Sequence, residues 1–309
     1  NEYFSGNILL ICPGYPMVKN KYLFSFIHSR VQAYKENKLN VDVAVVHSEY
    51  IEKTEFATFE NVDYIRTGYN QIRNLLQVRK YDKILIHFFD PAYFQLLEPQ
   101  DLSNTQIILY SHGTDALYRA FDVIGRPYFV SDYVVPESFT KTFALRDYYI
   151  KKYNNLPNVK FVFVSNWAKK MSEELLKIKY NNAEVIPCFI DEKQFPYTEK
   201  DPELRKRVFV LRKFDDLSTY SIDIDVRVIL ELSHRKCFND MEFSIYGDGG
   251  IHDKLVEPLR KFSNVHIYRK FLSHDEIKMM QKENGIGLFA TRFDTQAVSS
   301  CEAAMAGCV

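Results

Sequence analysis

The sequence has no net charge and no paired cysteines. Lys and Arg number 40, as do Asp and Glu, so no overall field attracts nucleic acid or an acidic lipid surface. The five cysteines are scattered, with no C-x-x-C and no histidine pair at zinc spacing. This pattern argues for a reducing compartment and against a structural metal. We therefore expect a cytoplasmic protein without a nucleic-acid partner.

Long hydrophobic runs are also missing. No apolar run approaches the roughly 20 residues of a transmembrane helix, and no basic-then-apolar leader is visible. Any membrane contact should therefore be peripheral, at the inner face of the membrane. Hydrophobic residues make up 46% and charged residues 26% of the 309 residues, which is a globular composition. The length allows about two domains of ordinary size.

Short apolar runs alternate with helical stretches, a pattern typical of parallel β-α-β layers. The first half predicts strands at 7–12, 41–47, 83–89, 106–112, 160–165 and 183–188, and helices at 22–37 and 165–178. The second half predicts strands at 207–214, 242–247, 264–271 and 285–291, and helices at 221–235, 252–262 and 273–283. We therefore predict an α/β protein with two Rossmann-like, doubly wound domains that face a central cleft.

The segment 189–207 interrupts this alternation. It is charged, contains two prolines and has no hydrophobic period, so it is typical of a linker. We predict domains at 1–190 and 207–309, joined by a linker at 191–206. Two helix starts are marked by caps: Ser165 or Asn166 opens one helix, and Ser273 with Glu276 forms a capping box at another.

Polar or glycine-containing loops follow several predicted strands. In doubly wound sheets a ligand binds beyond the carboxyl ends of the strands, where loops enter helices. We expect one cleft to be lined by CPGYPMVKNKY (12–22), SHGTDALYR (111–119), LRKFDD (211–216), YGDGG (246–250) and TRFDTQAV (291–298).

Glu302 is the only charged side chain between Thr295 and Val309. A buried carboxylate without a partner costs on the order of 1 to 5 kcal/mol, so it either binds a proton or finds a hydrogen-bond donor. The identity of that donor is the main question that this segment raises.

The segment RFDTQAVSSCEAAMAG (292–307) resembles the acid-x7-acid motif of family 4 glycosyltransferases, retaining enzymes of the GT-B fold. Further pieces agree in family order along nearly the whole chain: PGYP (13–16), FIHSRVQAY (26–34), HGTD (112–115), FVSNWAKKM (163–171), VIPCFIDEKQF (185–195), LRKFD (211–215) and YGDG (246–249). The resemblance implies a GT-B enzyme of the bacterial polysaccharide-biosynthesis type, with an acceptor-side domain at 1–190 and a nucleotide-sugar-binding domain at 207–309.

The resemblance also implies roles for individual residues. The second acid of the motif binds the ribose, which implies this role for Glu302, while the first acid, Asp294, would hold hydroxyls of the transferred sugar. His112 would contact the sugar, and Arg212 would stabilise the leaving diphosphate in place of a metal. Other residues implied to contact the donor are Gly14, Tyr15, Lys213, Gly247, Gly249, Phe271, Thr295, Gln296, Ala297 and Val298. No metal and no cofactor are implied, since the nucleotide sugar is a substrate.

The chain departs from the family pattern at several places. A lysine usually follows the arginine of the diphosphate site, where this chain has Ser218 and Thr219; Lys213 is a substitute, although it could point away from Arg212 on a strand. Ala297 replaces a glycine, so its Cβ could obstruct phosphate. The chain also stops at Val309, before the closing strands of the family, so we expect the second domain to be incomplete.

Simpler interpretations remain open for the same residues. Asp294 could cap the helix from Val298, Glu302 could pair with a basic side chain of the other domain, and GDGG could be an ordinary turn. The DID at 223–225 resembles the metal-binding D-x-D of other glycosyltransferases, but it falls within a helical pattern. The aromatic segment 118–153 fits core and domain surface, or an acceptor-facing or membrane-facing surface.

Three functions follow. The first is a retaining, metal-independent glycosyltransferase that moves a hexose from a nucleotide sugar to a glycan or lipid-linked acceptor in surface polysaccharide biosynthesis. The second is a catalytically weak GT-B paralogue that acts as a binding or partner subunit. The third, a phosphorylase-like or epimerase-like GT-B enzyme, lacks a visible motif. The sequence names neither the base nor the sugar of the donor.

Overall fold

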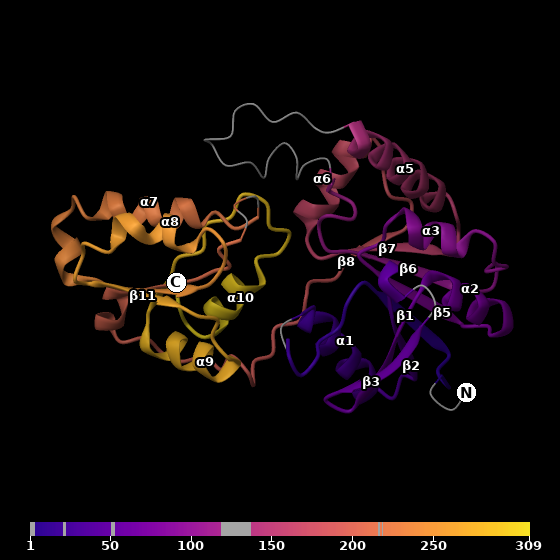
Figure 1. Cartoon of the computed structure of the whole chain (residues 1–309), viewed down its shortest axis with the longest axis horizontal. Helices are drawn as coiled ribbons and strands as arrows, with labels where there is room; N and C mark the ends of the chain where they lie inside the picture. The colour runs from indigo at the N-terminus through magenta and orange to yellow at the C-terminus, as the bar shows by residue number, and fades with distance from the viewer. Residues whose placement is uncertain (1–3, 21–22, 51–52, 119–136, 216, 218) are drawn as a thin grey trace. The chain divides into compact units, whose positions relative to one another are not determined.

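The computed structural model describes residues 4–20, 23–50, 53–118, 137–215, 217 and 219–309 (Figure 1). These residues form two compact units, one of residues 4–118 and 137–189 and one of residues 190–309. The part of the aromatic segment at 119–136 lies outside the described residues, as does Ser218. No helix within the described ranges is long and apolar enough to cross a membrane.

The N-terminal unit is built on an eight-stranded sheet with the order β3-β4-β2-β1-β5-β6-β7-β8. All neighbouring strands are parallel except β3 and β4, which form an antiparallel hairpin. The strands are β1 (Ile8–Cys12), β2 (Val41–Val46), β3 (Thr54–Phe59), β4 (Val62–Thr67), β5 (Lys83–His87), β6 (Gln106–Ser111), β7 (Val159–Phe163) and β8 (Ala183–Val185). The strand order reverses between β1 and β5, so this sheet has a switch point there.

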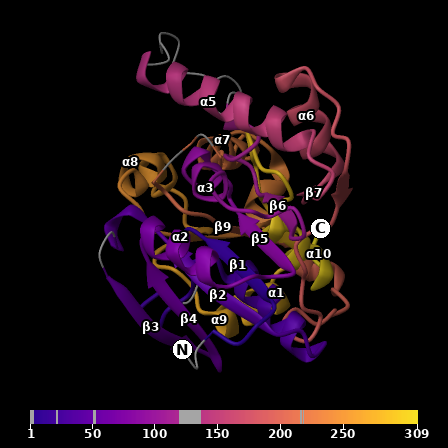
Figure 2. The same ribbon diagram turned by 90° about the vertical axis from the view of Figure 1, so that its right-hand side faces the viewer.

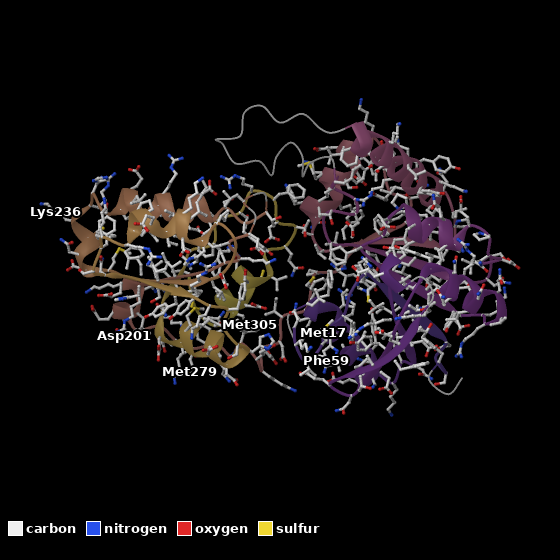
Figure 3. All side chains as sticks on the ribbon, in the orientation of Figure 1. Met17, Phe59, Asp201, Lys236, Met279 and Met305 are labelled. Carbon is white, nitrogen blue, oxygen red and sulfur yellow. The ribbon has the colours of Figure 1, made fainter. Side chains whose placement is uncertain are left out.

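The helices of this unit are α1 (Ser25–Glu36), α2 (Tyr69–Val78), α3 (Pro91–Leu97), α5 (Glu137–Asn154) and α6 (Asn166–Leu176). The helix α3 packs between α2 and α5, and Figure 2 shows α5 and α6 close together. The central strand β1 is buried along its whole length, as expected for a parallel strand covered on both faces. Phe59, labelled in Figure 3, ends β3 and lies in the same hydrophobic core as Leu10 and Val43.

The C-terminal unit contains four parallel strands in the order β11-β10-β9-β12. They are β9 (Arg207–Leu211), β10 (Glu242–Gly247), β11 (Val265–Arg269) and β12 (Ile286–Gly287), and the α-helices are α7 (Ile222–Leu232), α8 (His252–Val256), α9 (His274–Glu283) and α10 (Val298–Met305). The helices α7 and α8 lie on one side of this sheet, and α9 and α10 lie on the other (Figure 1). The strand order reverses between β9 and β12, which places the switch point of this unit beside the loops that follow these two strands.

Both predicted helix starts are confirmed. The Ser165 hydroxyl accepts a hydrogen bond from the Ala168 amide at 3.1 Å, so Ser165 is the cap of α6. At α9 the Ser273 hydroxyl accepts from the Glu276 amide at 3.3 Å, and the Glu276 carboxylate accepts from the Ser273 amide at 2.7 Å. This reciprocal pair is the predicted capping box.

Two local predictions differ from the structure. The helix expected at 252–262 stops at Val256 and continues as a 3-10 turn from Glu257 to Leu259, because Pro258 has no amide hydrogen to continue the helical bonds. The hairpin of β3 and β4 was not predicted. Its two turn residues, Glu60 and Asn61, both have positive φ, at 43° and 64°, without the glycine that usually marks such a turn.

The second half of the segment expected as a linker packs onto the C-terminal unit. Phe195 is 3% exposed and Lys200 is 9% exposed, and the Lys200 ammonium donates a hydrogen bond to the carbonyl of Gln281 on α9. The carbonyl of Leu204 accepts from the Gly285 amide at 2.8 Å. These contacts make the stretch from Phe195 part of the second unit.

Candidate active site

The loops after β9 and β12 lie side by side at the switch point of the C-terminal unit. The Ser221 amide donates to the Ala290 carbonyl at 3.1 Å, and the Arg292 amide donates to the Thr219 carbonyl at 3.1 Å. Because both strands are parallel, their carboxyl ends open at the same edge of the sheet. This pairing brings Arg212, which directly follows β9, to the start of α10.

Arg212 is a buried cation with unused donors. Its side chain is 5% exposed, and Nη1 donates to the Ser299 hydroxyl at 2.9 Å. The guanidinium carbon lies 4.8 Å from the ring centre of Phe289 and 5.1 Å from that of Tyr220. Nε and Nη2 have no hydrogen-bond partner among the described residues. Burial lowers the pKa of Arg212, whereas Asp225, Tyr220 and Asp294 raise it, and a guanidinium stays charged at any ordinary pH.

The turn before α10 is held by Asp294. Its Oδ1 accepts from the amides of Gln296 at 3.2 Å and Ala297 at 2.8 Å. Both amides precede α10, so Asp294 holds the turn and does not cap the helix, whose cap position Ala297 has no side-chain hydrogen bond. Ala297 has φ 54° and ψ 57°, the left-handed conformation that costs an alanine roughly 1–2 kcal/mol and a glycine almost nothing. The helix begins at Val298; the Ser300 amide donates to the Ala297 carbonyl at 2.9 Å, whereas the amides of Val298 and Ser299 precede the first hydrogen-bonded turn. Together with the helix dipole, they form an anion-binding end next to Arg212.

Glu302 lies one turn further along α10, on the helix face that carries Val298 and Ser299. Burial raises the pKa of its carboxyl to about 7. No hydrogen bond or ion pair reaches this carboxylate from the described residues of its own unit. The donor that its apolar setting requires is therefore not supplied by the part of the C-terminal unit that the structure describes.

The two aspartates of the DID sequence lie in the first turn of α7 and have structural partners. Asp223 forms a two-pronged ion pair with Arg292, at 2.7 and 2.6 Å. Asp225 is fully buried and accepts from the Ala290 amide at 2.9 Å through Oδ1, and burial raises its pKa to about 7. No group of three metal-binding side chains occurs among the residues that the structure describes. These aspartates tie α7 to the loop after β12.

The glycines of the β10 loop allow close backbone packing. Gly247 has φ 152°, and a Cβ there would lie 1.9 Å from the carbonyl oxygen of Arg212. Gly249 has φ 154°, and a Cβ there would lie 2.3 Å from the carbonyl carbon of Phe214. The absence of a side chain at these two glycines therefore allows the β10 loop to pack closely against the segment that carries Arg212.

Two other residues expected at the donor site are exposed. The Lys213 side chain is 59% exposed and pairs with Asp215 at 2.7 Å. It thus forms a surface ion pair, in contrast to its buried neighbour Arg212. Phe271 follows β11 and is 55% exposed.

In the N-terminal unit, Asp115 organises the HGTD turn after β6. Its carboxylate accepts from the Ser111 hydroxyl at 2.8 Å and from the amides of His112 at 2.9 Å, Gly113 at 3.1 Å and Ala116 at 2.8 Å. These bonds fix the backbone at His112, whose Nε2 lies 2.8 Å from Nδ1 of His87. The side chain of His112 is therefore held in one orientation.

The first loop differs from expectation in one respect. Tyr15 is 1% exposed, and its hydroxyl is bonded to Nδ1 of His28 at 2.8 Å, so its side chain belongs to the core rather than to a ligand site. Only its backbone could contact a donor. A Cβ at Gly14 would lie 2.6 Å from the ring of Phe24, so this position requires glycine for packing inside the unit.

Sequence reasoning missed four residues around Arg212, namely Ser299, Tyr220, Phe289 and Asp225. Ser299 could have been found, because it lies between the two acids of the motif on the first turn of the helix. The other three have no local signal, since they reach Arg212 only through the pairing of the two loops.

Comparisons with protein-family models and with curated proteins find no match. Solved structures show which fold the chain has. A trehalose-6-phosphate synthase, OtsA, matches 96% of this chain and 81% of its own length with a TM-score of 0.63 at 10% identity. Sucrose-phosphate synthase from Thermosynechococcus elongatus matches 96% of this chain and 78% of its own length with a TM-score of 0.62 at 11% identity. These neighbours are GT-B glycosyltransferases, and this chain has the GT-B fold.

A third structure, TarM, matches 72% of this chain with a TM-score of 0.49 at 15% identity. The chain spans 39% of the length of TarM.

The raised pKa of Glu302 predicts a pH-dependent stability. The folded protein binds this proton more tightly than the unfolded chain, with a pKa of about 7 instead of 4.5. The stabilisation is therefore complete below about pH 4.5 and is lost as the pH rises through about 7. We expect Glu302→Gln to gain stability relative to the parent across this window, by on the order of 1–3 kcal/mol. Urea unfolding of both proteins between pH 5 and pH 8 measures this difference.

Glu231→Gln is the matched control, because Glu231 is an exposed glutamate on α7. Its stability difference from the parent should stay flat over the same pH range. A flat difference for Glu302→Gln as well would show that the Glu302 carboxylate is not held in an apolar setting.

Proposed function

We propose that this chain is a retaining glycosyltransferase that transfers a hexose from a nucleoside-diphosphate sugar. The observation that carries the proposal is the buried guanidinium of Arg212, which lies beside the first turn of α10 and whose Nε and Nη2 have no hydrogen-bond partner among the described residues. A buried cation with unused donors and no ion pair within the described ranges is costly, so its persistence argues for an anionic ligand. The GT-B fold agrees with this proposal, because the solved neighbours are glycosyltransferases.

The diphosphate is the anion that this arrangement fits. Arg212 would donate to its oxygens, and the amides of Val298 and Ser299 would point at the same charge. The charge that develops on the leaving diphosphate would then be stabilised by a fixed cation and a helix end, without a metal ion. One neighbour, a trehalose-6-phosphate synthase, was solved with UDP-2-fluoro glucose, which is a donor of this chemical class.

Glu302 would bind the ribose of the donor, and Asp294 would bind the transferred sugar. Glu302 lacks a donor in its own unit, and the two neighbouring hydroxyls of a ribose would supply two. Asp294 uses Oδ1 to hold the turn, so Oδ2 would accept from hydroxyls of the transferred sugar. His112, from the HGTD turn, would contact the sugar as the glycosidic bond breaks.

The acceptor and the cellular role belong to the same proposal. We expect a glycan or lipid-linked acceptor and a role in bacterial surface polysaccharide biosynthesis, at the cytoplasmic side of the membrane. This assignment rests on the resemblance of the motifs at 112–115, 211–215 and 292–307. The unused donors of Arg212 favour ligand binding, which a catalytically weak GT-B paralogue acting as a binding subunit would share, so turnover of the intact donor separates the two functions.

Arg212→Met tests the central residue. Methionine keeps much of the volume and removes the buried charge, so the protein without ligand should be equally stable or more stable. Binding of UDP, GDP or ADP, whichever the parent prefers, should weaken by on the order of 1.5–3 kcal/mol, as expected for lost hydrogen bonds to a charged group. Calorimetry and thermal melting measure both effects. Lys213→Met is the control, because it removes a neighbouring exposed cation and should change binding little. Unchanged binding together with a much lower melting temperature in Arg212→Met would show that the arginine is structural.

Substitutions of Glu302 and Asp294 should affect different steps, nucleotide binding for Glu302 and turnover for Asp294. Glu302→Gln removes ground-state binding, so affinity for the free nucleoside diphosphate should fall by on the order of 1–3 kcal/mol. Asp294→Asn should leave that affinity nearly unchanged and lower turnover, because a misplaced sugar ring no longer aligns with the acceptor. Calorimetry with the diphosphate and turnover with the intact donor separate the two. Full nucleotide affinity in Glu302→Gln would remove Glu302 from the site.

Turnover should not require a metal ion. Because Arg212 and the amides of α10 would meet the diphosphate, activity with a panel of UDP-, GDP- and ADP-sugars should survive EDTA. A strict requirement for Mg²⁺ or Mn²⁺ would contradict the proposed mechanism. In that case Asp223 and Asp225 would be the candidate metal ligands, and substituting them by asparagine should abolish the activation of turnover by the metal ion.

A further inference from the structure

His87 and His112 form a hydrogen-bonded pair at the carboxyl ends of β5 and β6. Nδ1 of His87 lies 2.8 Å from Nε2 of His112, and the two rings lie end to end, with their centres 5.1 Å apart and an interplanar angle of 16°. A contact of this length between two ring nitrogens holds one proton, since two N–H groups or two lone pairs would repel each other. One histidine must therefore donate and the other must accept.

The buried side of His87 indicates which ring donates. His87 is 0% exposed, and its Nε2 has no hydrogen-bond partner among the described residues. Orphaned N–H donors are rarer in protein interiors than under-used acceptors. Nε2 of His87 is therefore the unprotonated nitrogen, and the single N–H of this neutral ring is on Nδ1. Nδ1 of His87 donates to Nε2 of His112, which leaves the proton of His112 on its own Nδ1.

The neighbours of the pair hold both rings in place and keep them neutral. The ring of Tyr110 stacks on His87 at 4.4 Å and 1°, and the rings of Phe26 and Phe88 contact His112 at 4.8 and 4.6 Å. Burial, with a smaller contribution from Arg30, lowers the pKa of His112 to about 3. His112 thus remains an uncharged imidazole at neutral pH.

We propose that His87 is a positioning residue that holds His112 in the Nδ1-protonated tautomer, so that His112 offers an N–H donor to an uncharged oxygen such as a sugar hydroxyl. The tautomer follows from the pair itself, whereas the sugar as its target rests on the proposed function. In this form His112 acts through a neutral hydrogen bond and not as a general acid.

The tautomer can be measured without any substrate. Nitrogen NMR of ¹⁵N-histidine-labelled full chain at pH 7, with the His112 signals assigned by His112→Asn, distinguishes protonation at Nδ1 from protonation at Nε2. We expect Nδ1 protonation in the parent and in His87→Asn, because the asparagine amide nitrogen takes the place of His87 Nδ1 as a donor. His87→Phe keeps a stacking ring but has no donor, so at least half of His112 should shift to Nε2 protonation.

Protonation at Nε2 in the parent would overturn the proposal, and so would an unchanged tautomer in His87→Phe. If His87→Phe does not fold, the parent and His87→Asn spectra decide the question, since both must show Nδ1 protonation. A transfer assay gives a second test. In this assay, His87→Phe should lower turnover about tenfold and leave KM for the donor within about twofold of the parent value, whereas His87→Asn should keep the turnover of the parent. Unchanged turnover in His87→Phe would overturn the positioning role. A parent without transfer activity would count against the proposed function, while the spectra would still decide the tautomer.

Discussion

The candidate site in the C-terminal unit depends on one constraint, the burial of the Arg212 guanidinium without an ion pair to any carboxylate that the structure describes. A buried charge persists only where its surroundings are fixed, and here Phe289, Tyr220 and the Ser299 hydroxyl surround it on separate sides. The backbone of the same residue is covered by Gly247, where a side chain would collide with the Arg212 carbonyl. Burial of such a cation lowers stability locally, a cost that is common at functional sites.

In each unit, an aspartate carboxylate holds a turn by accepting hydrogen bonds from backbone amides. Each candidate segment follows a parallel strand, β6 in one unit and β12 in the other, and contains a polar turn held by an aspartate. In the N-terminal unit the carboxylate of Asp115 gathers three backbone amides and one hydroxyl. In the second unit Asp294 gathers two amides with Oδ1. Asp115 is 2% exposed and fully used as an organiser, whereas Asp294 is half-buried and keeps capacity for a ligand.

The regular parts of the fold could be predicted because they depend on short patterns. A buried parallel strand reads as a continuous apolar run, so the strand predicted at 7–12 contains β1 at Ile8–Cys12. The capping box at Ser273 and Glu276 depends on two side chains three residues apart. The hairpin of β3 and β4 was missed because its turn has no glycine: Asn61 tolerates the left-handed conformation, but Glu60 rarely adopts it. The packing of Lys200 against α9 was missed because a lysine rarely has a buried ammonium.

The sequence by itself determined the fold class, the order of the strands along the chain, and the apolar setting of Glu302 on α10. It also marked Arg212, Asp294 and His112 at the ends of strands, since residue type and position relative to a strand are local properties. Only the tertiary structure decided that Arg212 meets Ser299, 87 residues away, and that Tyr15 turns its side chain into the core. It alone paired His87 with His112 and Asp223 with Arg292. The physical reason is that parallel strands pair without regard to their distance along the chain, so the neighbours of a strand end are set by the order of strands in the sheet.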